Sequence, residues 1–364
     1  MKKRTDPYYH IEEELEAYPA AWCYIIVGGR KTGKTYSALK YYYERKEPIV
    51  FVKRTNKDVD TLCNGSKIGR KGQKFELDLS PYKPLNRDLG INVKPFKIDD
   101  GLAAFYHAND DGEPEGAPVA YILSLYAVGK YKGFDLSECE AIVFDEFVPR
   151  SWERVSKDEG DELMDLYETV ARDRTTRGRK ELKLICLANA TNVYNPTCEI
   201  LEVVDIMSEM QARGMETMYI GERGIFIRKL KTDEEMMEDI KRTGIYKAME
   251  GTQWAAMAYE NEFAYNDFSC VKKMALKGFR PYVELTYKRK KIYIYGREDG
   301  VFYMTHSHGK GCIEYNLDTE MGQSAFFLDW CIRLMDAARY GRMWFEKYTY
   351  YDLIVNYKKR FSLK

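Results

Sequence analysis

Residues Ala21 to Tyr43 read AWCYIIVGGRKTGKTYSALKYYY, and this stretch decides how the chain folds. It begins with a short apolar run, Trp22 to Val27, which predicts a buried strand. The glycine-rich segment Gly28 to Thr35 follows and matches G-x-x-x-x-G-K-[ST] at every fixed position. Tyr36 to Glu44 contains no helix breaker and predicts a helix. A strand, a glycine loop and a helix in this order predict a loop that binds phosphate groups.

The residues of this loop have separate expected roles. Gly28 and Gly33 allow a tight turn whose N–H groups point at phosphate oxygens, and the helix N-terminus adds a partial positive charge. The Lys34 ammonium can reach the β- and γ-phosphates of ATP, and the Thr35 hydroxyl can bind Mg²⁺. A chance Lys-Thr after a glycine turn is the alternative, and both flanks argue against it. The expected nucleotide-binding residues of the loop are Gly28, Gly29, Arg30, Lys31, Thr32, Gly33, Lys34 and Thr35.

The composition limits the classes of partner. The chain has 364 residues, with 57 Lys and Arg against 57 Asp and Glu, so any nucleic-acid surface must be local. Its eight cysteines form no C-x-x-C pair, which indicates reduced core thiols and a reducing compartment. No stretch approaches the length of a membrane span, so we expect no membrane partner.

A second strand, Pro48 to Val52, ends in the basic residues Lys53 and Arg54. Open α/β sheets bind ligands at the carboxyl ends of their strands. We therefore expect one of these cations, with Arg54 as the candidate, to contact nucleotide or DNA. An ordinary solvated strand end fits the same residues.

The segment Glu140 to Phe147 reads EAIVFDEF and predicts an apolar strand that ends in two carboxylates. Asp145 is expected to hold the Mg²⁺ water shell, and Glu146 to polarise an attacking water. This adjacent glutamate distinguishes ATP hydrolases whose sheet contains an additional strand from small-molecule kinases. The apolar run Leu182 to Ala188 predicts a further strand, and Asn189 after it is either a γ-phosphate sensor or a strand-end turn residue.

An arginine-dense segment, Arg172 to Lys180, lies between these two strands and follows a predicted helix over Asp161 to Asp173. An arginine in this place can reach the γ-phosphate of a neighbouring subunit. Solvated surface charge is the alternative for every member of the segment.

Three phrases together resemble a known family. They are IVFDEF, then ETVARDR at Glu168 to Arg174, and then LICLANA with Asn195-Pro196 after it. In this order they resemble the ring-forming DNA-packaging ATPases of small tailed bacteriophages, relatives of the terminase large subunits. The resemblance covers nearly the whole chain, although the C-terminal third matches mainly by pattern.

The resemblance implies an ATP-driven translocase that pushes double-stranded DNA into a preformed capsid. It implies a homomeric ring, pentameric in the best-known relatives, that acts in the host-cell cytoplasm and docks transiently at the portal vertex. Whether a structural RNA or the portal protein is the docking partner is left open. Arg172 matches the arginine finger that acts on the neighbouring subunit, with Arg174 as the runner-up, and Lys130 and Lys132 match a second basic position.

The expected fold class is α/β: a RecA-like P-loop ATPase domain with a mainly parallel sheet at 1–206, a linker domain at 207–268 and an RNase H-like domain at 269–364. The last domain shows no acidic cluster for two metals, so we expect no nuclease activity. Its basic residues are expected to follow DNA phosphates without reading sequence. These DNA-binding candidates are Lys272, Lys273, Lys288, Arg289 and Lys290.

Two other classes of function remain open from the sequence. One is a different oligomeric P-loop motor, such as a helicase or a replication-initiator loader. The other is a DNA-independent nucleotide switch or kinase, against which the presence of Glu146 argues.

Overall fold

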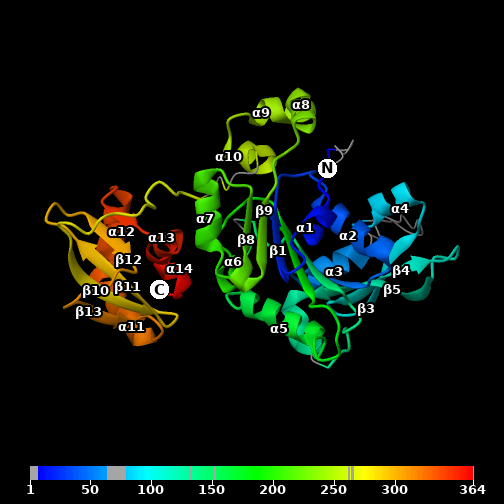
Figure 1. Cartoon of the computed structure of the whole chain (residues 1–364), viewed down its shortest axis with the longest axis horizontal. Coiled ribbons are helices and arrows are strands. Elements are labelled where there is room, and N and C mark those ends of the chain that lie inside the picture. The colour runs from blue at the N-terminus through cyan, green and yellow to red at the C-terminus, as the bar shows by residue number, and fades with distance from the viewer. Residues whose placement is uncertain are drawn as a thin grey trace, which may run out of the picture. The chain divides into compact units, whose positions relative to one another are not determined.

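The chain folds into two compact units. The computed structural model describes residues 7–63, 79–131, 133–150, 153, 155–260, 263 and 266–363. Unit 1 comprises Met1–Leu201 and Arg213–Tyr265, and unit 2 comprises Glu202–Ala212 and Asn266–Lys364. The cartoon in Figure 1 labels the elements of both units, which are described separately below.

Unit 1 is built on a sheet with the order β3-β4-β5-β2-β6-β7-β1-β9-β8. Its central strands, from β5 to β9, are parallel, and antiparallel strands complete both edges. The sheet is therefore mixed, with the expected parallel strands at its centre. The bounds of its strands are β1 Cys23–Val27, β2 Ile49–Lys53, β3 Val93–Asp99, β4 Leu102–Ala108, β5 Pro114–Ser124, β6 Ala141–Asp145, β7 Lys183–Ala188, β8 Thr217–Ile220 and β9 Ile225–Lys229.

The order of the parallel strands explains how distant motifs meet. Strand β7 lies between β1, which precedes the glycine loop, and β6, which ends in Asp145. This is the additional strand expected from the Asp145-Glu146 pair. Because β1, β6 and β7 are parallel, their carboxyl ends meet at one edge of the sheet. All five residues of β1 are buried, so the glycine loop starts from a fixed strand.

Helices surround this sheet. Helix α2 begins at Lys34, directly after Gly33, whose φ of +86° is a left-handed conformation that glycine adopts without a steric penalty. Side chains of α1, α2 and α4 join one face of the sheet in a continuous apolar core. The bounds of the helical elements are α1 Ile11–Ala17, α2 Lys34–Arg45, α3 Asn56–Cys63, α4 Lys83–Leu89, η1 Leu125–Tyr131, α5 Glu159–Ala171, α6 Pro196–Ile200, η2 Gly221–Arg223, α8 Glu234–Arg242, α9 Gly244–Met249, α10 Gln253–Ala255 and η3 Ala256–Glu260.

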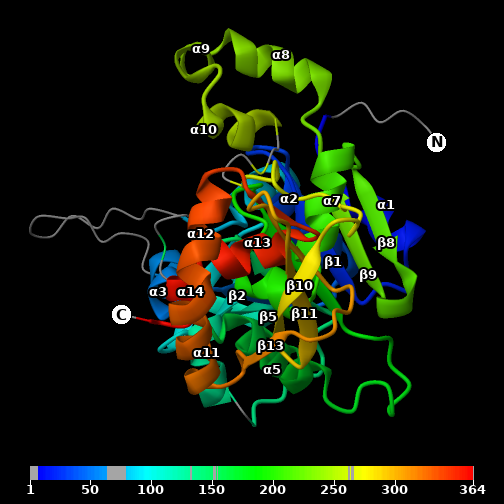
Figure 2. The same cartoon turned by 90° about the vertical axis from the view of Figure 1, so that its left-hand side faces the viewer.

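The region predicted as a separate linker domain, 207–268, is divided between the two units. Strand β9 pairs with β1 along its whole length, and β8 pairs with β9, so both extend the main sheet. Helices α8 and α9, seen together at one end of unit 1 in Figure 2, follow β9 and belong to the same unit. The linker was predicted because this region is rich in polar residues and glycines. Its two strands, β8 and β9, are too short to be recognised from the sequence pattern. The chain instead uses them to cover the open edge of β1.

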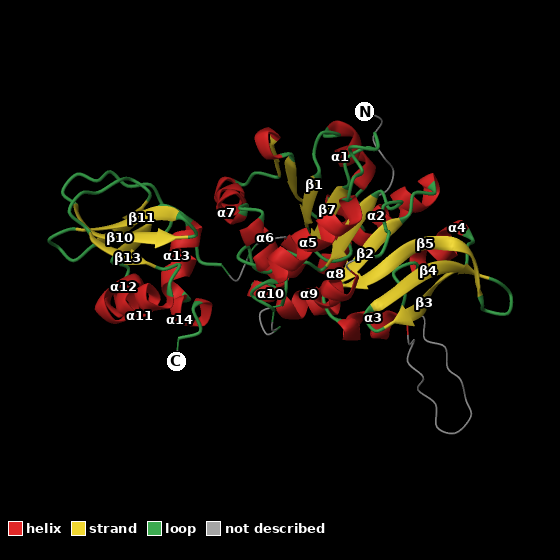
Figure 3. Cartoon of the chain, turned by 90° about the horizontal axis from the view of Figure 1, so that it is seen from below, coloured by secondary structure: helices red, strands yellow, loops and turns green. Residues whose placement is uncertain are grey.

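Unit 2 is a five-stranded sheet with helices. The strand order is β13-β10-β11-β12-β14, and its outer pairs, β10 with β13 and β12 with β14, are parallel. Figure 3 shows α11, α12 and α14 on one side of β10, β11 and β13, where their apolar side chains form a core with the sheet. The bounds are α7 Val204–Arg213, β10 Arg280–Tyr287, β11 Lys290–Gly296, β12 Phe302–Thr305, β13 Ile313–Asn316, α11 Glu320–Phe326, η4 Phe327–Cys331, α12 Ile332–Arg339, β14 Met343–Phe345, α13 Tyr348–Val355 and α14 Tyr357–Arg360. Among the described residues, no helix combines the length and the apolar character needed to cross a bilayer.

Candidate nucleotide-binding site

A pocket of about 440 Å³ lies where the glycine loop meets the carboxyl ends of β6 and β7. We call it the phosphate pocket. The structure brings together in it most of the residues that the motifs predicted. It is lined by Arg30, Lys31, Thr32, Gly33, Lys34, Thr35, Tyr36, Asp145, Glu146, Arg150, Ala188 and Asn189.

The Lys34 side chain turns back over the loop. Its ammonium group donates hydrogen bonds to the carbonyl oxygens of Gly28 (3.0 Å) and Gly29 (2.8 Å) and to the Thr32 hydroxyl (3.1 Å). Burial lowers the pKa of Lys34 to about 8, and the Asp145 carboxylate partly offsets this shift. A cation that is costly to bury and whose hydrogen bonds go to neutral oxygens would gain free energy from an anionic ligand.

The Thr35 hydroxyl donates to Asp145 Oδ1 at 3.0 Å, across 110 residues of sequence. The other carboxylate oxygen of Asp145 accepts from the Lys53 ammonium at 3.0 Å. A hydroxyl and a carboxylate are oxygen ligands of the kind that Mg²⁺ prefers, so these two residues fit the predicted metal site. Lys53 therefore pairs with Asp145, the residue predicted to hold Mg²⁺, while the neighbouring Arg54 contacts other residues.

Glu146 follows Asp145 in a strained turn. Its φ is +57°, which costs free energy for a residue with a side chain, and its side chain is exposed at the pocket. Arg54 braces this turn by donating to the carbonyl oxygens of Glu146 (3.2 Å) and Phe147 (2.8 Å).

Arg54 itself does not line the phosphate pocket, contrary to prediction. The side chain is only 5% exposed, and its guanidinium also pairs with Glu159 at 2.7 Å and Glu153 at 3.1 Å. Glu159 is fully buried, and the Tyr126 hydroxyl donates to it at 2.9 Å. The sequence placed Arg54 correctly at a strand end but gave no sign of this buried acidic partner.

Asn189 follows β7 and lines the phosphate pocket, as the sensor hypothesis requires. Three further pocket residues were not predicted: Tyr36, Arg150 and Ala188, the last residue of β7. Tyr36 directly follows the fixed positions of the glycine motif. Arg150 lies four residues after Glu146 in the segment DEFVPR, and no motif marks it.

Gly28 and Gly29 connect the loop to β7 and to the turn η3. The Gly28 N–H donates to the Ala188 carbonyl, which ties the loop to β7. The next residue, Gly29, faces the π-helical turn η3, and a Cβ at position 29 would come within 2.9 Å of the Ala258 carbonyl oxygen. The Arg30 N–H donates to that same oxygen at 2.9 Å. The loop is therefore bound by main-chain contacts on two sides.

Arg172 and Arg174, the two predicted finger candidates, differ in exposure. Arg172 ends α5 with a φ of +42°, and its side chain is 34% exposed. Its guanidinium donates to the Phe134 carbonyl and lies 3.9 Å from the Asp135 carboxylate.

Arg174 is 2% exposed. Its guanidinium donates to three carbonyl oxygens, those of Ser137, Cys139 and Lys180, and pairs with the Glu140 carboxylate. A side chain with these partners cannot reach another subunit without breaking a buried network. We therefore withdraw Arg174 as the runner-up finger.

The other predicted cations are mostly on surfaces. Lys130 is exposed and pairs with Asp100 at 3.0 Å, and Lys132 lies outside the described residues. In unit 2, the ammonium of Lys272 lies 3.5 Å from the centre of the Trp344 ring, next to the exposed Lys273.

Lys288 and Arg289 form the turn between β10 and β11, with φ values of +49° and +60°. The Asp318 carboxylate accepts from their N–H groups at 2.7 and 3.1 Å and so holds this strained turn. Lys290, which follows, pairs with Glu202. The DNA-binding candidates thus form two groups on different elements of unit 2.

Fold and site together define the class. A phosphate-binding loop, an additional strand, an acidic pair and a polar strand end are the parts of an ATP-hydrolysing P-loop protein. The family model described as "Podovirus DNA encapsidation protein (Gp16)" matches residues 6–314, and the chain belongs to this family. The resemblance stated from the sequence is confirmed.

Known relatives agree with this assignment. The DNA packaging protein of Bacillus phage B103 is 23% identical over 290 residues, which are 78% of this chain and 77% of that protein. A chain of the bacteriophage Phi-29 viral genome packaging motor assembly is 16% identical and shares the fold with a TM-score of 0.63 over 98% of this chain and 100% of its own. A chain of the Phi-28 gp11 DNA packaging motor gives 0.59 at 16% identity over 99% of both chains.

Proposed function

We propose that this chain is the ATP-driven translocase that packages double-stranded viral DNA into a preformed procapsid. The observation on which the proposal depends is the phosphate pocket, in which Lys34, the Thr35–Asp145 pair, Glu146 and Asn189 line one cavity in a member of a DNA encapsidation family.

Each of these residues has a role in hydrolysis. Lys34 binds the β- and γ-phosphate oxygens, leaving the loop carbonyls to which it now donates. Thr35 and Asp145 hold Mg²⁺, which when bound neutralises charge on the phosphates. Glu146 accepts a hydrogen bond from the attacking water and orients it, and Arg54 keeps the Glu146 turn in place. Asn189 contacts the γ-phosphate and responds to its loss.

Hydrolysis is completed by a neighbouring subunit in a homomeric ring. Arg172 is the finger, because its exposed guanidinium is held by one carbonyl and a distant carboxylate. Lys130 and Lys132 are candidates for a second contact across the same interface. The resemblance favours a pentamer that docks at the portal of the procapsid in the host-cell cytoplasm, and a structural RNA is a further candidate partner.

DNA is held by its phosphates, independently of sequence, so binding weakens as the salt concentration rises. The exposed cations of unit 2 contribute to this binding. We assign unit 2 to an RNase H-like domain without nuclease activity. Its described residues contain no group of three or more His, Cys, Asp or Glu side chains placed to hold a metal.

The test combines two measurements on the full chain. ATP hydrolysis is measured with and without long duplex DNA, and DNA packaging is measured as protection from nuclease after purified procapsids are added. We expect duplex DNA to stimulate hydrolysis and ATP to drive protection. Strand unwinding without protection would favour a helicase or a loader, and slow turnover that ignores DNA would favour a switch or kinase. Either result contradicts the proposal.

A further inference from the structure

Arg150 lines the phosphate pocket although it belongs to no recognised motif. It lies in the segment after β6, four residues beyond Glu146, and its side chain is exposed. The other lysine and arginine side chains that line the pocket, those of Arg30, Lys31 and Lys34, come from the glycine loop and the start of α2. The pocket therefore receives positive charge from two separate segments of this chain.

The main chain at Arg150 is held in a fixed turn. Its N–H donates to the Glu153 carboxylate at 3.1 Å, and its carbonyl accepts from the Glu153 N–H at 2.9 Å. The other oxygen of that carboxylate accepts from Arg54 at 3.1 Å. Arg54 also donates to the carbonyls of Glu146 and Phe147. One buried guanidinium thus holds both the turn with the water-orienting carboxylate and the turn with this cation.

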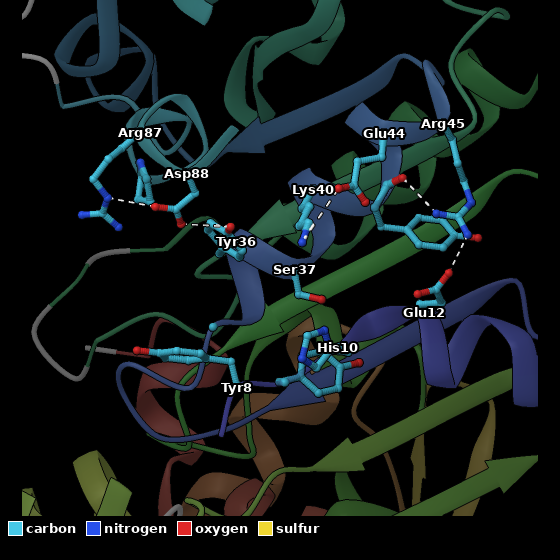
Figure 4. A pocket seen from close by; sticks show the side chains of 14 residues that line it. Tyr8, His10, Glu12, Tyr36, Ser37, Lys40, Glu44, Arg45, Arg87 and Asp88 are labelled. Carbon is cyan, nitrogen blue, oxygen red and sulfur yellow. Dashed lines mark hydrogen bonds and ion pairs between the residues drawn. The ribbon is translucent and has the colours of Figure 1, made fainter. Parts of the chain in front are cut away.

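The balance of charge distinguishes the phosphate pocket from the cavity beside it. That second cavity, of about 620 Å³, shares Gly33 and Tyr36 with the pocket and is drawn in Figure 4. Each lysine and arginine that lines it pairs with a carboxylate of the same cavity, as the dashed lines show: Lys40 with Glu44, Arg45 with Glu12 and Arg87 with Asp88. The lining of the phosphate pocket instead has more cations than carboxylates: Arg30, Lys31, Lys34 and Arg150 against Asp145 and Glu146. An excess of positive charge suits an anionic ligand.

We infer that Arg150 is a second catalytic arginine, which contacts the γ-phosphate of the ATP bound to its own chain. The inference rests on the proposed function and adds a residue to its reaction. In hydrolysis the water oxygen bonds to the γ-phosphorus, the bond from this phosphorus to the β–γ bridging oxygen breaks, and ADP keeps the electron pair. One proton of the water passes through Glu146 to the released phosphate. A guanidinium beside the γ-phosphate oxygens stabilises the charge that the transition state spreads over them.

Arg172 and Arg150 serve different sites in this scheme. The guanidinium of Arg172 is held at the Phe134 carbonyl, near the Asp135 carboxylate, and it does not line the phosphate pocket of its own chain. Arg150 lies before α5 and lines that pocket, whereas Arg172 lies at the end of α5 and remains available to a neighbour. Each ATP site of the ring then contains one arginine from each of two subunits.

The first experiment measures rates and affinities of the full chain. Arg150→Ala should lower the rate of hydrolysis at saturating ATP by about 10²–10³, the usual effect of removing one preorganised donor from a transition state. ADP affinity should be unchanged because ADP has no γ-phosphate, and ATP affinity should fall much less than the rate. Arg150→Lys, which keeps the charge without the planar fork, should recover part of the rate. Arg177→Ala, at an exposed arginine outside the pocket, is the matched control and should change none of these quantities.

The second experiment decides which chain's ATP Arg150 contacts. In a mixed ring of Arg150→Ala and Arg172→Ala subunits, some sites combine an intact Arg150 with an intact Arg172 from the neighbour, so activity should return in part. A mixed ring of Arg150→Ala and Lys34→Ala subunits should show no recovery, because no chain then has both residues intact. The opposite pattern would place Arg150 in the neighbour's site and overturn the inference.

The remaining outcomes separate this inference from the proposed function. An unchanged rate in Arg150→Ala rejects the inference and leaves the proposed function standing. An equal loss of ATP and ADP affinity means that Arg150 only maintains the shape of the pocket, and it rejects the inference too. A wild-type chain that hydrolyses no ATP, with or without DNA, overturns the proposed function and the inference together.

Discussion

The phosphate pocket and the arginine-rich segment after α5 are both marked by conspicuous residues in the sequence, yet the structure treats them differently. In the pocket, residues from three distant segments meet as expected, and Thr35 contacts Asp145 across 110 residues. In the arginine-rich segment, two arginines separated by one residue have opposite positions, since Arg172 is exposed and Arg174 is buried.

The difference shows what a motif specifies. The pocket residues follow strands whose carboxyl ends share one edge of a parallel sheet, so the strand order alone places them together. No such rule distinguishes one arginine from another. The partners of Arg174 are the Glu140 carboxylate and carbonyls before β6 and β7, and these are set by tertiary packing.

The largest expected effect is the loss of ATP hydrolysis when the exposed Arg172 is replaced. Arg172→Ala in the assembled, DNA-bound ring should lower the rate of hydrolysis by about 10³–10⁵, because the finger stabilises transition-state charge. The rate of ATP hydrolysis at saturating ATP measures this. Arg177→Ala is the matched control, since Arg177 is exposed and pairs with the nearby Asp173.

Mixed rings sharpen the same prediction. Arg172→Ala subunits combined with Lys34→Ala subunits should regain part of the activity, because some interfaces then contain an intact Lys34 and an intact Arg172. Normal hydrolysis by the ring of Arg172→Ala subunits alone would mean that this residue is not the finger.

The second prediction concerns the pocket. Glu146→Gln should lower hydrolysis by about 10²–10⁴ and leave ATP affinity nearly unchanged, because the amide fills the same space but cannot accept the proton of the water. Equilibrium ATP binding and single-turnover hydrolysis measure the two quantities. Lys34→Ala, which should lose affinity as well, is the contrasting variant. Equal losses of both in Glu146→Gln would show that Glu146 binds nucleotide instead.

The third prediction concerns the folding stability of the Arg174 and Arg172 variants. Arg174→Ala should lower the free energy of unfolding by about 3 kcal/mol, because it removes a buried guanidinium that donates to the Cys139 and Lys180 carbonyls and shares the Glu140 carboxylate with Arg179. Arg172→Ala should change it by less than about 0.5 kcal/mol. Urea denaturation measures both. Equal stabilities of the two variants would remove the distinction drawn between these arginines.

The smallest expected effect concerns DNA. Arg289→Ala should weaken duplex binding only a few-fold and lower the slope of log affinity against log salt by about one, the amount expected for one phosphate contact. Lys290→Ala should lower it less, because Lys290 already pairs with Glu202. Filter binding over a range of salt concentrations measures the slopes. Equal slopes for wild type and Arg289→Ala would exclude this turn from the DNA contact.

The sequence predicted the centre of unit 1 well because local rules determine it. The strands β1, β6 and β7 lie within two residues of the predicted runs, since each is an apolar run stopped by glycine or polar residues. The pocket residues followed from those strand ends. Arg54 was misplaced because its partner Glu159 lies 105 residues away and belongs to no motif. The pairing of β9 with β1 could not be predicted for a similar reason, because it joins distant parts of the chain.

The contact between Gly29 and Ala258 limits how this protein can vary. The general phosphate-loop motif accepts any residue at its second position, but here even one methyl group would press on a main-chain oxygen that cannot rotate away. A substitution at position 29 would therefore have to be accompanied by a shift of the turn at 256–260. We therefore expect the residue at position 29 and the backbone of η3, more than 220 residues further along the chain, to change together in evolution.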